Sequence, residues 1–269
     1  MKATGLRRKP TDKFYTSAKV AQRCVEAARP HVSLPGAIIV EPSAGGGAFI
    51  PYVRGLADTC MFYDLEPEHP EVIKQDFLDL QLDMPDGTHL CFVGNPPFGR
   101  QSSLAIKFIK KCSIAGNVIA FILPSSFKKD SMKRHFPPRF HLVHEHDIER
   151  NAFTADGTPC DVPCVFQVWV KTDHDRAVPA KLTPAGFSFV GKHDAPDLAF
   201  RRVGVYAGRV YMDIADRAEQ SHYFLKLDDA DNLEAKTALL NSLSFAVGNT
   251  VGPRSVSKQE LIAEYSKAI

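Results

Sequence analysis

Leu90-Cys91-Phe92-Val93-Gly94-Asn95-Pro96-Pro97-Phe98 is an apolar run that ends in a Gly-Asn-Pro-Pro-Phe turn. The run is typical of a short buried strand. The side-chain oxygen of Asn95 and the backbone carbonyl of Pro96 can accept hydrogen bonds, and the prolines fix φ and remove competing donors. Phe98 offers a stacking face. The stretch suits a flat base that carries an amino group, and an ordinary strand-ending turn is the alternative reading.

Other short apolar runs alternate with helical stretches on both sides of this turn. Helices are predicted over residues 18–29, closed by Pro30, and 103–112; strands are predicted over 37–40, 60–64, 73–77, 90–93, 117–123, 140–147 and 165–170. Alternating strands and helices predict parallel pairing and an α/β doubly wound sheet. Ligands of such sheets bind outside the carboxyl ends of the strands, and the candidate site residues all follow strand ends.

After residue 171 the sequence becomes rich in proline and glycine, and short strands are predicted at 187–190 and 203–206. We therefore expect a flexible arm at residues 1–12, a catalytic domain at 13–175 and a smaller C-terminal region at 176–269.

The composition excludes several classes of protein. The chain has 269 residues, a hydrophobic share of 44% and 33 basic against 31 acidic residues, so it is no strongly basic nucleic-acid binder. Its six cysteines lack zinc-ligand spacing and mostly lie in apolar stretches, as free thiols do. No secretory or membrane-spanning stretch is present. We expect a soluble intracellular protein, cytoplasmic or nuclear, with no membrane partner and no metal.

A glycine turn, Gly45-Gly46-Gly47, directly follows the predicted strand 37–40. Glycines there let the backbone approach a ligand closely. The dinucleotide spacing G-x-G-x-x-G fails because residue 50 is Ile, and the P-loop Gly-Lys-Ser/Thr is absent. Asp64 follows about twenty residues later, the usual distance of a carboxylate that binds ribose hydroxyls. Asp76 and Phe77 end the next predicted strand.

These motifs, in this order, resemble those of the S-adenosylmethionine-dependent adenine N-6 methyltransferases. Lys13-Phe14-Tyr15-Thr16 is similar to their K-F-Y-T-P motif, with Ser17 in place of Pro; residues 41–49 are similar to their acidic-Pro glycine motif; and Asn95-Pro96-Pro97-Phe98 is similar to their catalytic motif. The resemblance covers about residues 13–171 and follows the γ order of DNA adenine methyltransferases. It implies a Rossmann-like methyltransferase sheet that is mostly parallel, with a late antiparallel strand.

The resemblance also implies S-adenosylmethionine as cofactor and a role for each motif residue. Tyr15 and Thr16 would line its methionine end, Glu41 and Pro42 would belong to the motif that faces its ammonium, and Gly45 and Gly47 would let the chain pass close by. Asp64, with Glu66 as second choice, would bind the ribose hydroxyls, and Asp76 and Phe77 would hold the adenine. Asn95, Pro96, Pro97 and Phe98 would hold the target base.

The expected activity is methylation of the N-6 amino group of adenine, with nucleic acid as partner and DNA favoured. RNA and, less well matched, a protein glutamine are the alternative substrates; glutamine enzymes of this type usually have Tyr where Phe98 stands. Phe153 is a candidate for the other face of the target base, with core packing as its alternative. His144 and His146 share one face of a predicted strand, and their role and the oligomeric state stay open.

Overall fold

The computed structural model describes residues 14–85, 87–155, 157–177, 179–229, 232–245 and 254–269. The expected N-terminal arm, residues 1–12, lies outside them. Contacts divide the chain into two compact units, Met1–Val178 and Pro179–Ile269. No helix in the described ranges is both long and apolar enough to span a lipid bilayer.

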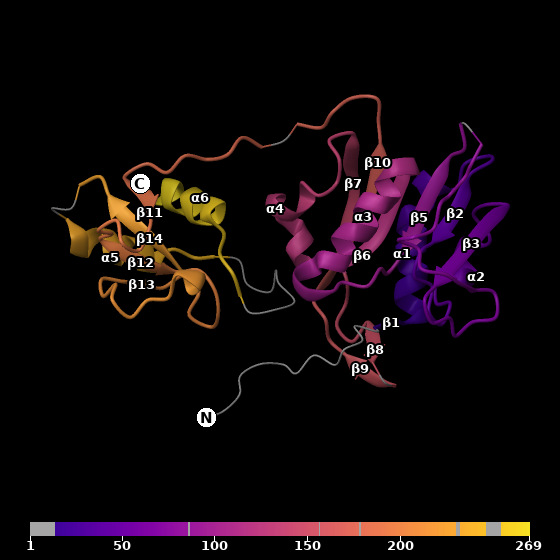
Figure 1. Cartoon of the computed structure of the whole chain (residues 1–269), viewed down its shortest axis with the longest axis horizontal. Coiled ribbons are helices and arrows are strands. Elements are labelled where there is room, and N and C mark those ends of the chain that lie inside the picture. The colour runs from indigo at the N-terminus through magenta and orange to yellow at the C-terminus, as the bar shows by residue number, and fades with distance from the viewer. Residues whose placement is uncertain (1–13, 86, 156, 178, 230–231, 246–253) are drawn as a thin grey trace. The chain divides into compact units, whose positions relative to one another are not determined.

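A seven-stranded sheet forms the centre of the first unit (Figure 1). Its order is β4-β3-β2-β5-β6-β10-β7. The strands are β2 (Ile38–Glu41), β3 (Thr59–Asp64), β4 (Ile73–Lys74), β5 (Leu90–Gly94), β6 (Val118–Pro124), β7 (Phe140–Asp147) and β10 (Cys164–Lys171). The first five pair in parallel, and β10 is antiparallel to both β6 and β7. The α/β sheet expected from the sequence, mostly parallel with a late antiparallel strand, is therefore confirmed.

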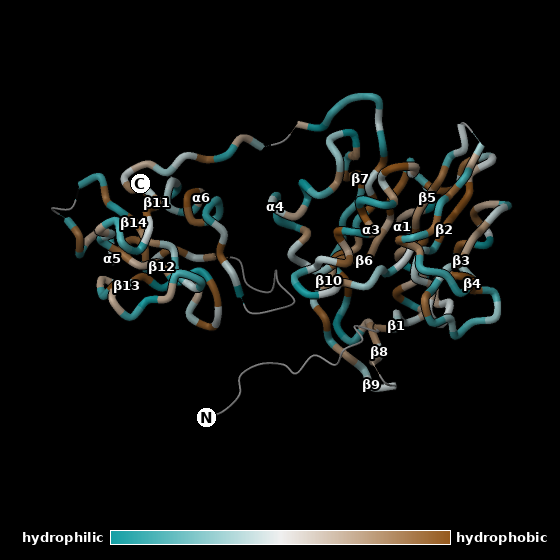
Figure 2. Tube along the Cα trace, in the orientation of Figure 1, coloured by the Kyte–Doolittle hydropathy of each residue, from teal (hydrophilic) through white to brown (hydrophobic). Residues whose placement is uncertain are grey.

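Hydrophobic residues concentrate in the strands of this sheet, and the connecting loops are largely hydrophilic (Figure 2). Every residue of β5 and β6 is buried, which is the pattern of parallel strands covered on both faces. The helical elements of the unit are α1 (Ala18–Val32), α2 (Ile50–Val53), η1 (Arg100–Ser102), α3 (Ser103–Ala115), η2 (Ser125–Lys128) and α4 (Asp130–Lys133). Of these, α1 contacts β5, β6 and β10, and α3 contacts β6.

Helix α1 begins as its sequence indicates but ends later. The hydroxyl of Ser17 accepts a hydrogen bond from the Val20 N–H at 3.4 Å and caps the helix. The predicted end at Pro30 is wrong, because the helix continues to Val32. Proline has no N–H, so Pro30 itself cannot donate a helical hydrogen bond. The Ser33 N–H still donates to the Arg29 carbonyl at 3.1 Å, and the last turn is kept.

A small second sheet holds the N-terminal segment of the unit in place. Its order is β1-β8-β9, formed by β1 (Tyr15–Thr16), β8 (Phe153–Ala155) and β9 (Thr158–Cys160). Tyr15 pairs with Thr154 and Thr16 pairs with Phe153. The β8–β9 hairpin is inserted in the chain between β7 and β10. A late segment of the first unit therefore pairs with Tyr15 and Thr16, which come before all strands of the main sheet.

The single tryptophan of the chain, Trp169, is buried in β10. Its ring stacks on Phe136 with centroids 4.1 Å apart and an interplanar angle of 10°. The Arg176 guanidinium lies 5.2 Å from the indole and donates to the carbonyls of Lys133, Phe136, Pro137 and Phe140. This arginine fastens the last residues of the first unit to the loop between α4 and β7.

The second unit contains a four-stranded antiparallel sheet of order β11-β14-β12-β13. Its elements are β11 (Phe187–Val190), β12 (Leu198–Arg201), β13 (Val210–Tyr211), η3 (Glu219–Ser221), β14 (His222–Leu227), α5 (Leu233–Ser242) and α6 (Lys258–Ala268). Side chains from both helices and the sheet form one hydrophobic core, in which Phe187 contacts Tyr265 edge to face at 5.1 Å.

The predicted strand at 203–206 is wrong. Strands lie on either side of it, and residues 203–208 form the turn that joins β12 to β13. Gly204 and Gly208 adopt φ of 98° and 104°, which glycine tolerates and other residues rarely adopt. The turn is closed by a hydrogen bond from the Gly208 N–H to the Arg201 carbonyl at 2.8 Å.

Candidate active site

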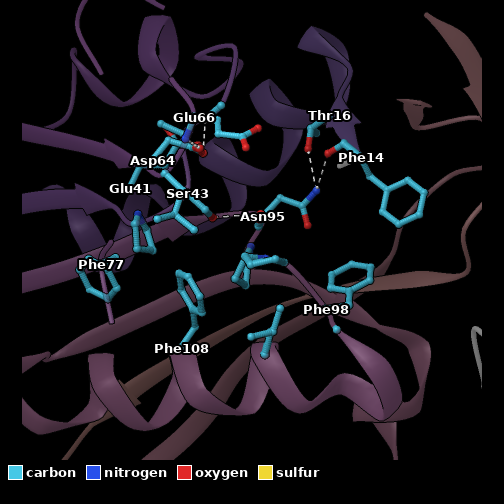
Figure 3. Close-up of a pocket in the computed structure, with 18 of the residues that line it drawn as sticks. Phe14, Thr16, Glu41, Ser43, Asp64, Glu66, Phe77, Asn95, Phe98 and Phe108 are labelled. Atoms are coloured by element: carbon cyan, nitrogen blue, oxygen red, sulfur yellow. Dashed lines mark hydrogen bonds between the residues drawn. The ribbon is translucent and has the colours of Figure 1, made fainter. Parts of the chain in front are cut away.

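A cavity of about 740 Å³ lies where β2, β3 and β5 end (Figure 3). This volume is within the range of small-molecule sites, and the carboxyl ends of parallel strands are where such folds bind ligands. The structure brings together all but one of the site residues expected from the sequence. Those that line the cavity are Tyr15, Thr16, Glu41, Pro42, Gly45, Asp64, Asp76, Phe77, Asn95, Pro96, Pro97 and Phe98, together with the second choice Glu66.

Asn95 stands at the end of β5, and its amide is oriented by the N-terminal segment. Its Nδ2 donates to the Thr16 hydroxyl at 3.1 Å and to the Phe14 carbonyl at 3.4 Å. A backbone carbonyl can only accept, so the nitrogen must face Phe14. The Asn95 Oδ1 is left buried without a hydrogen-bond partner. A buried acceptor of this kind is costly unless a ligand supplies a donor.

The turn of Asn95 is also tied to the glycine-rich loop. The Ser43 hydroxyl donates to the Asn95 backbone carbonyl at 3.2 Å. That carbonyl is therefore occupied, whereas the side-chain oxygen is available. Figure 3 shows the carboxylates of Glu41, Asp64 and Glu66 on one side of Asn95, and Phe98 on the other.

Aromatic rings line the Phe98 side of the cavity. Phe98 is buried, and its ring lies 6.3 Å from that of Phe14, which in turn lies 6.4 Å from Phe153. Phe153 belongs to β8 and is not among the lining residues. Phe153 therefore does not contact the second face of a base in the cavity. It is buried and packs against Phe14, in the strand β8 that pairs with β1.

Asp64 holds the glycine turn with one oxygen and its own following loop with the other. Oδ2 accepts from the Gly45 N–H and Oδ1 accepts from the Glu66 N–H, each at 2.8 Å. Tyr15 covers this turn, since a Cβ built on Gly46 would lie 3.7 Å from its ring, and its hydroxyl donates to Glu68. The carboxylate expected to bind a ribose therefore also shapes the loop beside it.

Gly47 is the one expected cofactor-binding residue that does not line the cavity. It is buried with φ of 78°, and a Cβ there would lie 2.8 Å from the His69 ring and 2.9 Å from Ile50. Close packing inside the turn, rather than approach of a ligand, explains the glycine at this position.

Glu41 is a carboxyl group almost without contact to solvent. It is 2% exposed, and its Oε2 has no hydrogen-bond partner. Burial raises its pKa well above the ordinary value of 4.5, and the nearby charge of Asp64 raises it further. Gly94 makes room for it, because a Cβ at that position would lie 3.1 Å from the Glu41 Cγ. The site thus contains an acid that favours the proton until a cation comes near.

An aromatic wall closes the end of the cavity opposite Phe98. Phe77 is buried between Phe108, on which it stacks at 5.8 Å, and Phe92, which it meets edge to face at 5.7 Å. Asp76 lies just before it, and its Oδ1 accepts from the Leu78 N–H at 2.9 Å. A flat ligand ring would meet the edges or faces of these side chains.

Several lining residues were not expected from the sequence: Phe14, Ser43, Arg100, Leu104 and Phe108. Phe14 was part of a quoted motif without a role of its own. Phe108 lies on the helix that follows the Asn-Pro-Pro-Phe turn, and the sequence had indicated only a helix there. Arg100 comes directly after Phe98 and Gly99, and this position was the one feature of the sequence that could have indicated a charged residue at the cavity.

His144 and His146 contact each other outside this site. The His144 Nε2 and the His146 Nδ1 are 2.8 Å apart. Burial, followed by the charges of Arg23 and His144, lowers the pKa of His146 to about 4. Within the described ranges no three His, Cys, Asp or Glu side chains are arranged to hold a metal ion.

Comparison with known proteins gives one family match. Residues 56–158, less than half of the chain, match the model of the EDM2 methyltransferase-like domain. The match begins just before β3 and ends in the β8–β9 hairpin, so it includes Asp64, Asp76 and Asn95. The description of this family agrees with the methyltransferase class expected from the sequence. Among the curated proteins no sequence matches this chain.

Solved structures of methyltransferases are similar to about three fifths of this chain. A candidate RNA methyltransferase, PH1948 from Pyrococcus horikoshii, is 16% identical with a TM-score of 0.47, over 63% of this chain and 93% of its own. The 23S rRNA methyltransferase ErmE is 17% identical with a TM-score of 0.45, over 61% and 71%. A candidate class I S-adenosylmethionine-dependent methyltransferase from Listeria monocytogenes is 12% identical with a TM-score of 0.46, over 64% and 65%.

Proposed function

We propose that this chain is an S-adenosylmethionine-dependent methyltransferase that methylates the N-6 amino group of adenine in nucleic acid, with DNA as the favoured substrate. One observation carries the proposal. The Asn95 amide is held through its nitrogen by Phe14 and Thr16, which leaves a buried oxygen without a partner that can accept from a ligand. An exocyclic amino group supplies the donor that this oxygen lacks.

The residues of the cavity fit the cofactor. When bound, S-adenosylmethionine supplies a methyl group on a positively charged sulfur, which is already activated for transfer. Asp64 and Glu66 would accept from the ribose hydroxyls, and Asp76 from the adenine amine. Phe77 and Phe108 would contact the adenine ring. Glu41 would face the ammonium, beside Tyr15 and Thr16 at the methionine end, and its buried, unpartnered Oε2 supports a cationic ligand there.

Asn95 and Pro96 would prepare the target nitrogen. The lone pair of an adenine amino group is delocalised into the ring, which makes it a weak nucleophile. Acceptance of both N–H groups, by the Asn95 Oδ1 and the Pro96 carbonyl, favours a pyramidal nitrogen with a localised lone pair. The lone pair of the nitrogen would form the new N–C bond as the S–C bond breaks. The electron pair of the S–C bond would stay on sulfur, and the surplus proton on nitrogen would leave to solvent. Fixed acceptors and in-line positioning supply the rate.

Phe98 would hold the base by stacking. A target inside a duplex must leave the helix to reach this pocket, and aromatic side chains are the usual support of an extruded base. DNA is favoured because the motif order resembles that of DNA adenine methyltransferases. We assign target recognition to residues 176–269 on their position after the catalytic unit.

The test is methyl transfer from labelled S-adenosylmethionine by the full chain to separate pools of DNA, RNA and protein. We expect label in DNA as N-6-methyladenine. Asn95→Ala should abolish transfer while calorimetry still shows cofactor binding. Label in RNA alone would keep the chemistry and overturn the preference for DNA. Label in protein alone, or near-normal turnover by Asn95→Ala, would overturn the proposal.

A further inference from the structure

The turn between β12 and β13 presents two large side chains to solvent. Val205 is 89% exposed and Tyr206 is 57% exposed, whereas the next residue, Ala207, is buried in the core of the second unit. A single exposed apolar residue is ordinary on a protein surface. Two adjacent ones at the tip of a turn form a small projecting apolar surface.

Backbone hydrogen bonds hold this tip firmly. The Ala207 N–H donates to the Gly204 carbonyl at 3.0 Å, and the Arg209 N–H donates to the Tyr206 carbonyl at 3.1 Å. The strand-like segment before α6 supports the turn from one side, where the Gly204 N–H donates to the Arg254 carbonyl at 2.9 Å. Val203 and Ser255 form an isolated β-bridge. The two exposed side chains therefore project from an ordered base.

Arginines surround the tip. Between β12 and the end of β13 the charged residues are Arg201, Arg202 and Arg209, with no acid among residues 198–212. The Arg209 guanidinium lies 4.9 Å from the Tyr206 ring and supports one of its faces. Arg202 lies 5.1 Å from the Tyr223 ring. Arg254 is the residue whose carbonyl accepts from the Gly204 N–H of the turn.

Several other cations of the second unit are paired with carboxylates. Lys226 pairs with Asp197 at 2.9 Å, and Arg217 pairs with Asp213 at 3.4 Å. Within the described part of the chain, Arg201, Arg202, Arg209 and Arg254 make no ion pair with a carboxylate and bond to carbonyl, hydroxyl or ring partners instead. The Nε atoms of Arg202 and Arg254 are buried without a hydrogen-bond partner, and no described carboxylate neutralises the four charges.

We propose that the β12–β13 turn is a nucleic-acid contact, in which Tyr206 and Val205 pack against a base and the flanking arginines bind phosphates. Sequence-tolerant stacking of bases on aromatic rings, next to basic side chains, is a common mode of nucleic-acid binding, and apolar side chains flanked by arginine also insert between base steps. This inference rests on the proposed function, because the bound strand is the methylation substrate.

The experiment measures binding of the full chain to a fluorescent DNA duplex, a single-stranded DNA and an RNA hairpin at two salt concentrations. Tyr206→Ala should raise Kd about 5- to 150-fold, and Tyr206→Phe should retain the wild-type Kd because the ring remains. Arg209→Ala should lower the slope of log K against log salt by about 1. Lys267→Ala is the control, since this exposed cation stands at the C-terminal end of α6, away from the Val203–Ser255 bridge, and pairs with Glu264 at 2.7 Å.

Further measurements separate the two proposals. With Tyr206→Ala and Arg209→Ala, cofactor binding and kcat at saturating substrate should stay at wild-type values while KM rises. If the wild-type chain methylates nucleic acid but Tyr206→Ala binds it with unchanged affinity, the turn is not a contact and the proposed function stands. If the variants change instead the oligomeric state or the melting temperature, the tip covers protein, and the inference is overturned. If the wild-type chain binds cofactor but no nucleic acid, both proposals fail.

Discussion

The Nδ2 of Asn95 donates a hydrogen bond to the hydroxyl of Thr16 at 3.1 Å, across 79 positions of sequence. Thr16 lies in β1, which pairs with β8 of an inserted hairpin. The orientation of the candidate catalytic amide is therefore set by two segments from opposite ends of the first unit. The consequence is that residues remote from the cavity act on the amide through β1.

Removal of the Thr16 hydroxyl should reduce turnover. Thr16→Val keeps the shape of the side chain but leaves the Asn95 Nδ2 with the Phe14 carbonyl alone. A hydrogen bond of this kind contributes about 0.5–1.5 kcal/mol, so kcat should fall about 2- to 12-fold in a methyl-transfer assay. Thr16→Ser, which restores the hydroxyl, should recover most of the rate. Equal rates for Thr16→Val and the wild type would show that the contact does not position Asn95.

Loss of the Phe98 ring should affect the target base more than the cofactor. Phe98→Ala removes the stacking face, which is worth about 1–3 kcal/mol per base, so kcat/KM for nucleic acid should fall about 5- to 150-fold. The cofactor Kd, measured by calorimetry, should stay nearly constant because Phe98 lies on the other side of Asn95. Phe98→Tyr should retain binding. A parallel loss of cofactor affinity would contradict the stacking role.

Binding of the cationic cofactor should release a proton. The pKa of Glu41 is raised by burial and by Asp64, and a positive charge beside it favours the ionised form. The observed binding enthalpy should therefore vary with the ionisation enthalpy of the buffer, and affinity should rise with pH. In Glu41→Gln both dependences should disappear. A buffer-independent enthalpy for the wild type would exclude Glu41 as the group that ionises.

The same residue gives an independent check without cofactor. Since the folded chain holds a proton on Glu41 that the unfolded chain releases, this group makes the free energy of unfolding fall as pH rises above 4.5, the ordinary pKa, toward the raised value. Glu41→Gln should flatten that slope in denaturant titrations at a series of pH values. An unchanged slope would place the proton elsewhere.

His146 should make the protein sensitive to acid. Its pKa is lowered from 6.5 to about 4, first by burial. Because the unfolded chain binds this proton at a higher pH than the folded chain does, the free energy of unfolding should decrease as pH falls from 6.5 toward about 4. His146→Gln should weaken this decrease, and NMR titration of the wild type should show a His146 midpoint near 4. A midpoint near 6.5 would contradict the prediction.

Local sequence patterns were sufficient for the order and type of the main-sheet strands. The runs at 37–40, 60–64, 90–93 and 117–123 lie within one residue of the observed β2, β3, β5 and β6, because strands of a parallel sheet covered on both faces are nearly continuous apolar runs. The strand predicted at 73–77 was too long, since only Ile73–Lys74 is strand. Patterns also failed where glycine or proline acted otherwise than expected. Gly204 placed a turn inside an apolar run, and Pro30 left α1 intact for two more residues.

The site was less accessible to sequence reasoning because its contacts are long-range. Pairing of β1 with β8 cannot be read from either segment, and it decides both the position of Phe153 and the orientation of Asn95. Asp64 accepts from the backbone N–H groups of Gly45 and Glu66. The first of these contacts depends on how the glycine turn lies against the end of β3. Gly47 was expected from the motif to lie beside the cofactor. The structure instead explains this glycine by its close packing against His69 and Ile50.

The stack of Trp169 on Phe136 makes intrinsic fluorescence a selective reporter. All indole emission of the chain arises from this one ring, buried beneath Arg176 in the first unit. The change in tryptophan fluorescence on exposure of this ring would report the unfolding of the first unit alone. Circular dichroism would record the unfolding of both units. A gap between the two transitions would measure how independently the first and the second unit melt.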